Sequence, residues 1–174
     1  GESSALYNIG YCYENGIGVE QDNNKMIEYY EKSAESGNSN ALFSLGLCYK
    51  NGKGVEQNYT KMIEYYEKAE KLENSDAVFN LGLCYENGEG VEQNYTKMLE
   101  YYEKAAELDN TDALFSLASI YYQGKGVEQN YSKVFEYYEK AASLGESSAL
   151  YSIGYCYEKG IGVDQDYSIA IKYY

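Results

Sequence analysis

The sequence predicts an all-α fold, an α-solenoid built from repeated helix-turn-helix units, and two observations lead to this prediction. The first is a period of 36 residues, in which Ala-Leu or Ala-Val recurs from Ala5 to Ala149. The second is that the apolar residues inside each period follow the 3.6-residue spacing of helices. The composition agrees, because 24 Tyr with no Pro, His or Trp is typical of one short segment copied several times.

Each period also contains a Gly-x-Gly-Val tetrad and, in its second half, a Tyr-Tyr pair. We therefore predict a single repeat array over residues 1–174, with units at about 3–38, 39–74, 75–110, 111–146 and a truncated 147–174. Residues 1–18 match residues 145–162 at all but two positions, which indicates a block of four units within a longer array. We expect the chain to be a fragment of that array.

The first helix of each unit has an apolar face, which in the first unit contains Leu6, Ile9, Gly10 and Tyr13. Its end is marked by Gly16 and the copies of Gly16, which can adopt the left-handed conformation after a helix. Its start is marked by a hydroxyl residue, which we expect to cap the free amides. These predicted caps are Ser3, Ser39, Ser75, Thr111 and Ser147.

The second helix carries an apolar stripe that in the first unit runs through Met26, Tyr29, Tyr30 and Ser33. It opens at an Asp or Asn, either of which can accept from first-turn amides. The predicted caps are Asp22, Asn58, Asn94, Asn130 and Asp166. The three Asn copies also match the N-glycosylation pattern, which would matter only in a secretory compartment. Capping is favoured, because two copies carry Asp.

Glycine in mid-helix needs an explanation, because it costs about 1 kcal/mol relative to alanine. It occurs in the first helix of four units, at Gly10, Gly46, Gly82 and Gly154, and the fourth unit has Ala118 instead. We expect a close approach of the paired helix there, with small size as the requirement.

The order Ala-Leu-x-x-(Ile/Leu)-Gly-x-x-Tyr, then Gly-x-Gly-Val, Asp/Asn, Lys, Tyr-Tyr and Ala, resembles the Sel1-like repeats, which are relatives of the tetratricopeptide repeat. The resemblance spans the whole chain and implies a right-handed superhelix of helix pairs. Departures are local: Met follows Lys25, and the fourth unit has Ala118 and Ser119. The resemblance implies adaptor and scaffold roles and does not identify the partner.

Charge and composition restrict the function. The net charge of -14 disfavours nucleic acid and anionic membranes, so we expect a basic or neutral protein or peptide as partner, with no membrane insertion. Without His, neither a zinc cluster nor a Cys-His nucleophile can form. One Cys per unit (Cys12, Cys48, Cys84, Cys156) indicates small buried hydrophobes rather than disulfides. We predict no enzymatic activity, no cofactor and no metal.

The resemblance to tetratricopeptide repeats places the binding surface on the first helices, which line the concave side. By position, that face presents Tyr7, Tyr11, Phe43, Leu47, Phe79, Leu83, Phe115, Tyr151 and Tyr155, with Glu14, Lys50, Glu86, Tyr122 and Glu158 at the rim. An alternative is that Tyr7 and its copies pack between units. Tyr11, Leu47, Leu83 and Tyr155 are favoured for binding, because the fourth unit tolerates Ser119 at this position.

Two function classes follow. The first is a non-catalytic scaffold that binds a peptide or protein on its concave face. The second is a regulatory or substrate-recruiting array within a larger signalling enzyme such as a kinase, which the gene on either side of this segment would reveal. The compartment stays open: a cytoplasmic location is favoured, and a secretory one would require an upstream signal.

Overall fold

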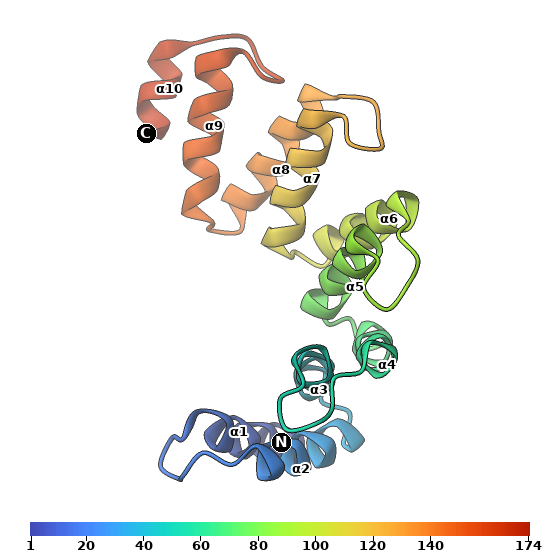
Figure 1. Ribbon diagram of the computed structural model, residues 1–174. Helices are drawn as coiled ribbons and strands as arrows, with labels where there is room; N and C mark the ends of the chain where they lie inside the picture. Colours follow the sequence, from blue (N-terminus) through green and yellow to red (C-terminus); the bar gives the residue numbers. More distant parts are fainter. The chain divides into compact units, whose positions relative to one another are not determined.

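The computed structural model describes all residues from Gly1 to Tyr174 and consists of ten α-helices without strands (Figure 1). The helices are α1 (Glu2–Asn15), α2 (Asn23–Glu35), α3 (Ser39–Asn51), α4 (Tyr59–Glu70), α5 (Ser75–Asn87), α6 (Tyr95–Glu107), α7 (Thr111–Gln123), α8 (Tyr131–Ser143), α9 (Ser147–Lys159) and α10 (Tyr167–Tyr173). Each predicted unit therefore contains two helices. None of them has both the length and the apolar character required to cross a bilayer.

The chain divides into two compact units, residues Gly1–Asn94 and residues Tyr95–Tyr174. In the first, α1 pairs with α2 and α3 with α4, and the pairs join through α2 against α3 and α4 against α5. In the second, α6 packs on α7, α7 pairs with α8, α8 packs on α9, and α9 pairs with α10. The organisation of residues 1–174 as a single array remains a prediction.

The second helices begin at the predicted residues. Asp22 accepts hydrogen bonds from the amides of Asn24 and Lys25, and Asn58 accepts from the amide of Lys61. Asn130 and Asp166 cap α8 and α10 in the same way. The capping role expected for this position is therefore confirmed at these four residues.

The predicted caps of the first helices were wrong, by one residue in α3, α5, α7 and α9 and by two residues in α1. The cap is the residue before the hydroxyl: Asn38, Asn74 and Asn110 each accept from the backbone amide three residues later. Their backbones are extended, which lets the short carboxamide fold back onto the first turn, whereas Ser39 is already helical. Helix α1 starts at Glu2 and α9 at Ser147, neither with a side-chain cap.

The two glycines of each tetrad have different roles. The first, Gly16 and its copies, follows the first helix with a φ near +70°, as predicted. The second also has a positive φ, but in later repeats it lies against the preceding second helix: a Cβ on Gly54 would lie 2.8 Å from the Asn23 carbonyl oxygen. A Cβ added to Gly18, which has a φ of +72°, would have no other atom within 4 Å.

The core of the first compact unit forms where one repeat meets the next. Met26, Ile27 and Tyr30 of α2 pack with Leu45 and Cys48 of α3. The mid-helix glycines explain how the tyrosine rings fit, because a Cβ on Gly10 would lie 2.6 Å from the ring of Tyr30. The expected close approach of the paired helix is therefore observed, and its cause is a fully buried tyrosine.

Candidate protein-interaction site

The predicted binding residues fall into two sets of equivalent positions on the first helices, four residues apart. We call the first the position-7 set, which contains Tyr7, Phe43, Phe79, Phe115 and Tyr151. We call the second the position-11 set, which contains Tyr11, Leu47, Leu83, Ser119 and Tyr155. Because the two compact units are described separately, each set is considered repeat by repeat.

Rings of the position-7 set contact the second tyrosine of the Tyr-Tyr pair in their own repeat. The ring centroids are 5.4 Å apart for Tyr7 and Tyr30, and 5.7 Å apart for Phe43 and Tyr66. Equivalent contacts join Phe115 to Tyr138 and Tyr151 to Tyr174. Phe79 is half-buried. The position-7 set is therefore used in part for packing within a repeat, and its role in binding stays a prediction.

The position-11 set contributes little to the core. The side chains of Tyr11 and Tyr155 are 47% and 40% exposed, and Leu47 and Leu83 are half-buried. None of the four belongs to the buried core, and Ser119 is exposed. In four of five repeats, therefore, an apolar or aromatic side chain at this position keeps part of its surface in contact with water.

The predicted rim residues make contacts between and within repeats. Glu14 accepts a hydrogen bond from the Tyr30 hydroxyl and pairs with Lys53 of the next repeat at 3.0 Å. Lys50 pairs with Glu89 at 2.9 Å, so the same link has the opposite polarity one repeat later. Tyr122 contacts the ring of Tyr131. Hydrogen bonds from Lys159 and Tyr174 lower the pKa of Glu158.

A small pocket opens beside the position-11 residue of the last repeat. It has a volume of about 180 Å³ and is lined by Tyr122 of α7, Val134 and Tyr138 of α8, Tyr155 and Cys156 of α9, and Ile161. We define these six residues as the α7–α9 pocket. Sequence reasoning placed Tyr155 and Tyr122 at the surface but missed the pocket. The sequence did contain a sign of the pocket, because Val134 has a shorter side chain than the methionines at the equivalent position of the first three repeats. These methionines are Met26, Met62 and Met98.

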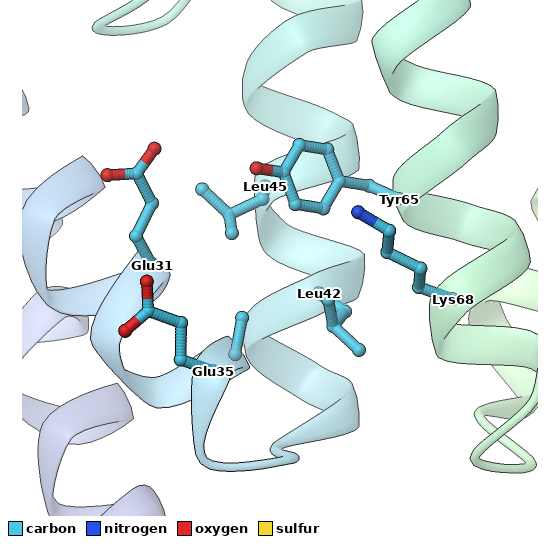
Figure 2. A pocket seen from close by; sticks show the side chains of 7 residues that line it. Glu31, Glu35, Leu42, Leu45, Tyr65 and Lys68 are labelled. Atoms are coloured by element: carbon cyan, nitrogen blue, oxygen red, sulfur yellow. The ribbon is translucent and has the colours of Figure 1, made fainter.

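A second hollow, of about 420 Å³, lies between the second helices α2 and α4, and sequence reasoning did not predict it. Figure 2 shows Leu42 and Leu45 of α3 between the two walls. Glu31 and Glu35 line the wall from α2, and Tyr65 and Lys68 line the wall from α4. The ammonium of Lys68 lies 5.1 Å from the centroid of the Tyr65 ring. The hollow is thus polar at its edges, and Leu42 and Leu45 expose little of their surface.

Three of the four cysteines are buried in the repeats. All four are free thiols, and Cys48, Cys84 and Cys156 are buried. Burial raises the pKa of the Cys48 thiol to about 12, and it raises the pKa of Cys84 and Cys156 to about 11. Neutral thiols are poor nucleophiles and poor metal ligands. The expected role of these three cysteines as small buried hydrophobes is confirmed, and Cys12 differs in being half-exposed.

Comparisons with known proteins agree with the helix pairs and their period. The family model described as Sel1 repeat matches residues 3–38, 39–74, 75–110, 111–146 and 147–174. The chain is similar to the crystal structure of a Sel1 repeat protein from Oxalobacter formigenes, with 29% identity and a TM-score of 0.89 over 98% of this chain and 70% of that one. The predicted all-α repeat fold is confirmed.

Two further solved structures are similar. One is a protective antigen of uropathogenic Escherichia coli that displays an SLR fold, with 32% identity and a TM-score of 0.87; the match covers 98% of this chain and 37% of that one. The other is cysteine rich protein B of Helicobacter pylori, with 30% identity, a TM-score of 0.53, and coverage of 64% and 90%. No curated protein sequence matches the chain significantly.

Proposed function

Because the chain belongs to the Sel1 repeat family, whose members generally act as protein-interaction scaffolds, we propose that it is a non-catalytic scaffold that binds a protein or peptide on its first helices. The observation that carries this proposal is the position-11 set. Its tyrosines are exposed and its leucines half-buried, so all four leave apolar surface in contact with water, and none belongs to the buried core. Aromatic side chains of this kind dominate the energetics of protein interfaces.

The charge of the molecule supports a basic or neutral partner. A net charge of -14 repels nucleic acid and accelerates the association of positively charged proteins, with a rate that falls as ionic strength rises. Two buried, neutral thiols, Cys48 and Cys84, lie on the same helices as Leu47 and Leu83, and they offer no nucleophile there. The proposed face therefore supplies contact area and shape rather than chemistry.

The test is to replace Leu47 and Leu83 by Asp together and to measure retention of partners on the immobilised chain. Because both leucines are outside the buried core, we expect partner retention to fall at least about tenfold, by loss of apolar contact and by burial of charge, while the fold persists. Circular dichroism and the melting temperature report the fold.

Leu72 provides a matched control, since it is 47% exposed and follows α4, away from the first helices. Leu72→Asp makes the same chemical change and should leave retention intact. Equal loss in the control, or unfolding of the Leu47→Asp, Leu83→Asp double variant, would refute the assignment of this face.

A further inference from the structure

We propose that the α7–α9 pocket is an anchor site that takes one large apolar side chain from a peptide segment flanked by basic residues. This inference rests on the proposed function, because it names the part of the surface that selects the partner. It concerns the second compact unit alone, residues Tyr95–Tyr174.

The pocket lies where the fourth repeat departs from the first three at two positions. In the first repeat, Tyr30 lies fully buried against Gly10, and Tyr66 lies in the same way against Gly46. The fourth repeat has Ala118 there, and its methyl group occupies the space that the ring would need. Tyr138 is accordingly only half-buried, whereas Tyr30 and Tyr66 are fully buried.

The second departure removes volume beneath the displaced ring. Met26, Met62 and Met98 are fully buried, whereas Val134 at the equivalent position has a shorter side chain. The shorter floor and the displaced wall together account for a cavity of about 180 Å³.

The chemistry of the lining selects an uncharged side chain. None of the six lining residues carries a charge, and the Cys156 thiol stays neutral because burial raises its pKa to about 11. Val134 and Cys156 are buried at the floor, while Tyr122 and Tyr155 are about 40% exposed at the mouth. A carboxylate or ammonium in this setting would lose hydration without gaining a partner. A Leu or Phe side chain would bury its surface between two rings.

Charge complementarity indicates which residues stand beside the apolar anchor in the bound peptide. The second compact unit contains twelve Asp and Glu residues against seven Lys, and Lys159, whose ammonium lies 5.8 Å from the centroid of the Tyr155 ring, is paired with Glu158 at 2.6 Å. Basic residues beside the apolar anchor are attracted by this field, whereas acidic residues are repelled. The occupant that fits both the lining and the field is a segment with a large apolar residue between Lys or Arg residues.

The experiment is an NMR titration of the full chain with five-residue peptides, capped at both ends, of sequence Lys-Gly-X-Gly-Lys, where X is Leu, Phe, Ala or Glu. We expect the Leu or Phe peptide to bind at least about tenfold more tightly than the Ala peptide, because only a large side chain fills the pocket. The shifted resonances should include Tyr155 and Ile161. A Leu peptide flanked by Glu should bind more weakly than its Lys counterpart.

Val134→Met is the diagnostic variant, because it introduces the methionine of the first three repeats and fills the floor. It should reduce affinity for the Leu peptide at least about tenfold without lowering the melting temperature. Val19→Met, the same change at an exposed residue of the first repeat, is the control. Should Val134→Met perturb folding, Tyr155→Ser removes one wall and introduces the residue found at position 119.

The proposal is overturned if the Leu and Ala peptides bind equally, or not at all, or if neither pocket variant weakens binding. These outcomes are distinct from failure of the proposed function. A partner whose retention depends on Leu47 and Leu83 but not on Val134 supports the scaffold and removes the pocket. Peptide binding that depends on Val134, with no retention dependent on Leu47 and Leu83, supports the pocket and removes the wider face.

Discussion

The hydroxyl of Tyr30 donates a 2.5 Å hydrogen bond to the carboxylate of Glu14, whereas the equivalent hydroxyl of Tyr66 is buried without a partner. Both rings are fully buried. The position of the first helix that supplies the acceptor Glu14 in one repeat is occupied by Lys50 in the next, and an ammonium group cannot accept a hydrogen bond. Burial and the bond to Glu14 raise the pKa of Tyr30, and burial raises that of Tyr66.

Removing the two hydroxyls should therefore have different effects. We expect Tyr30→Phe to lower the free energy of unfolding by about 1.5 to 3 kcal/mol, because a hydrogen bond to a charged acceptor is lost. Tyr66→Phe should be neutral or stabilising, because it removes a buried polar group that has no partner. Urea denaturation of the two variants measures the difference. Equal destabilisation would show that the Tyr66 hydroxyl has a partner in solution.

The ion pairs between repeats alternate in polarity, Glu14 with Lys53 and then Lys50 with Glu89. We expect Lys53→Glu to place two carboxylates together and to cost about 1 kcal/mol at low salt, because partly exposed pairs are worth about 0.2 to 1 kcal/mol. Adding Glu14→Lys should recover part of this loss. A double-mutant cycle at two NaCl concentrations measures the coupling, which should shrink as salt rises. A coupling of zero would mean that the pair is only a surface contact.

Replacing the second tetrad glycine by alanine in two repeats gives a comparison in which the strain of a positive φ is the same in both variants. Gly18 and Gly54 have φ of +72° and +73°, but only Gly54 lies against a preceding helix. Gly54→Ala should therefore cost about 1 to 3 kcal/mol more than Gly18→Ala, because Asn23 and Ile27 must move. Thermal unfolding of both variants checks this difference. If the two melt alike, the contact between these repeats is looser than described.

The mid-helix glycines should differ in the same manner. Gly46→Ala gains helix propensity of about 1 kcal/mol but forces a Cβ into the fully buried ring of Tyr66. We expect a net loss of about 1 to 2 kcal/mol. Gly154→Ala is the control, because its nearest ring, that of Tyr174, is 55% exposed and can move away. Gly154→Ala should be neutral or slightly stabilising, and a stabilising Gly46→Ala would contradict the packing argument.

Thiol reactivity tests the burial of the cysteines. At pH 8, iodoacetamide should modify Cys12 first, because Cys12 is half-exposed while the other three are buried and neutral. Peptide mass spectrometry against time identifies the modified residue, and denatured chain provides the control in which all four react. Rapid labelling of Cys48 or Cys84 in the folded chain would contradict their burial.

The same thiols predict a loss of stability in alkali. Burial raises the folded pKa values of these thiols to about 11 to 12, above the ordinary value of 9.0, so between these values the folded chain binds more protons than the unfolded chain. The free energy of unfolding should therefore decrease as the pH rises above about 9. Urea titrations at pH 8 and pH 10 measure the change. Cys48→Ala in combination with Cys84→Ala should reduce this pH dependence, and no reduction would assign it to other groups.

Local features of the fold could be predicted from the residues alone. The 36-residue period, the positive φ of Gly16 and the capping by Asp22 depend on short-range sterics and hydrogen bonds, which a sequence pattern records directly. The caps of the first helices were misplaced because Asn38 and Ser39 are both good capping residues, and only the backbone conformation distinguishes them.

The surface depended on tertiary structure for its details. The sequence by itself determined that Tyr11, Leu47 and Tyr155 are not required by the core stripe, since helical periodicity assigns residues to faces. Only the tertiary structure decided that Phe43 packs on Tyr66, that the Tyr66 hydroxyl lacks a partner, and that Val134 leaves a pocket. The physical reason is that packing depends on the volumes that meet from separate helices, and a change of one side chain has meaning only when the side chains opposite to it are known.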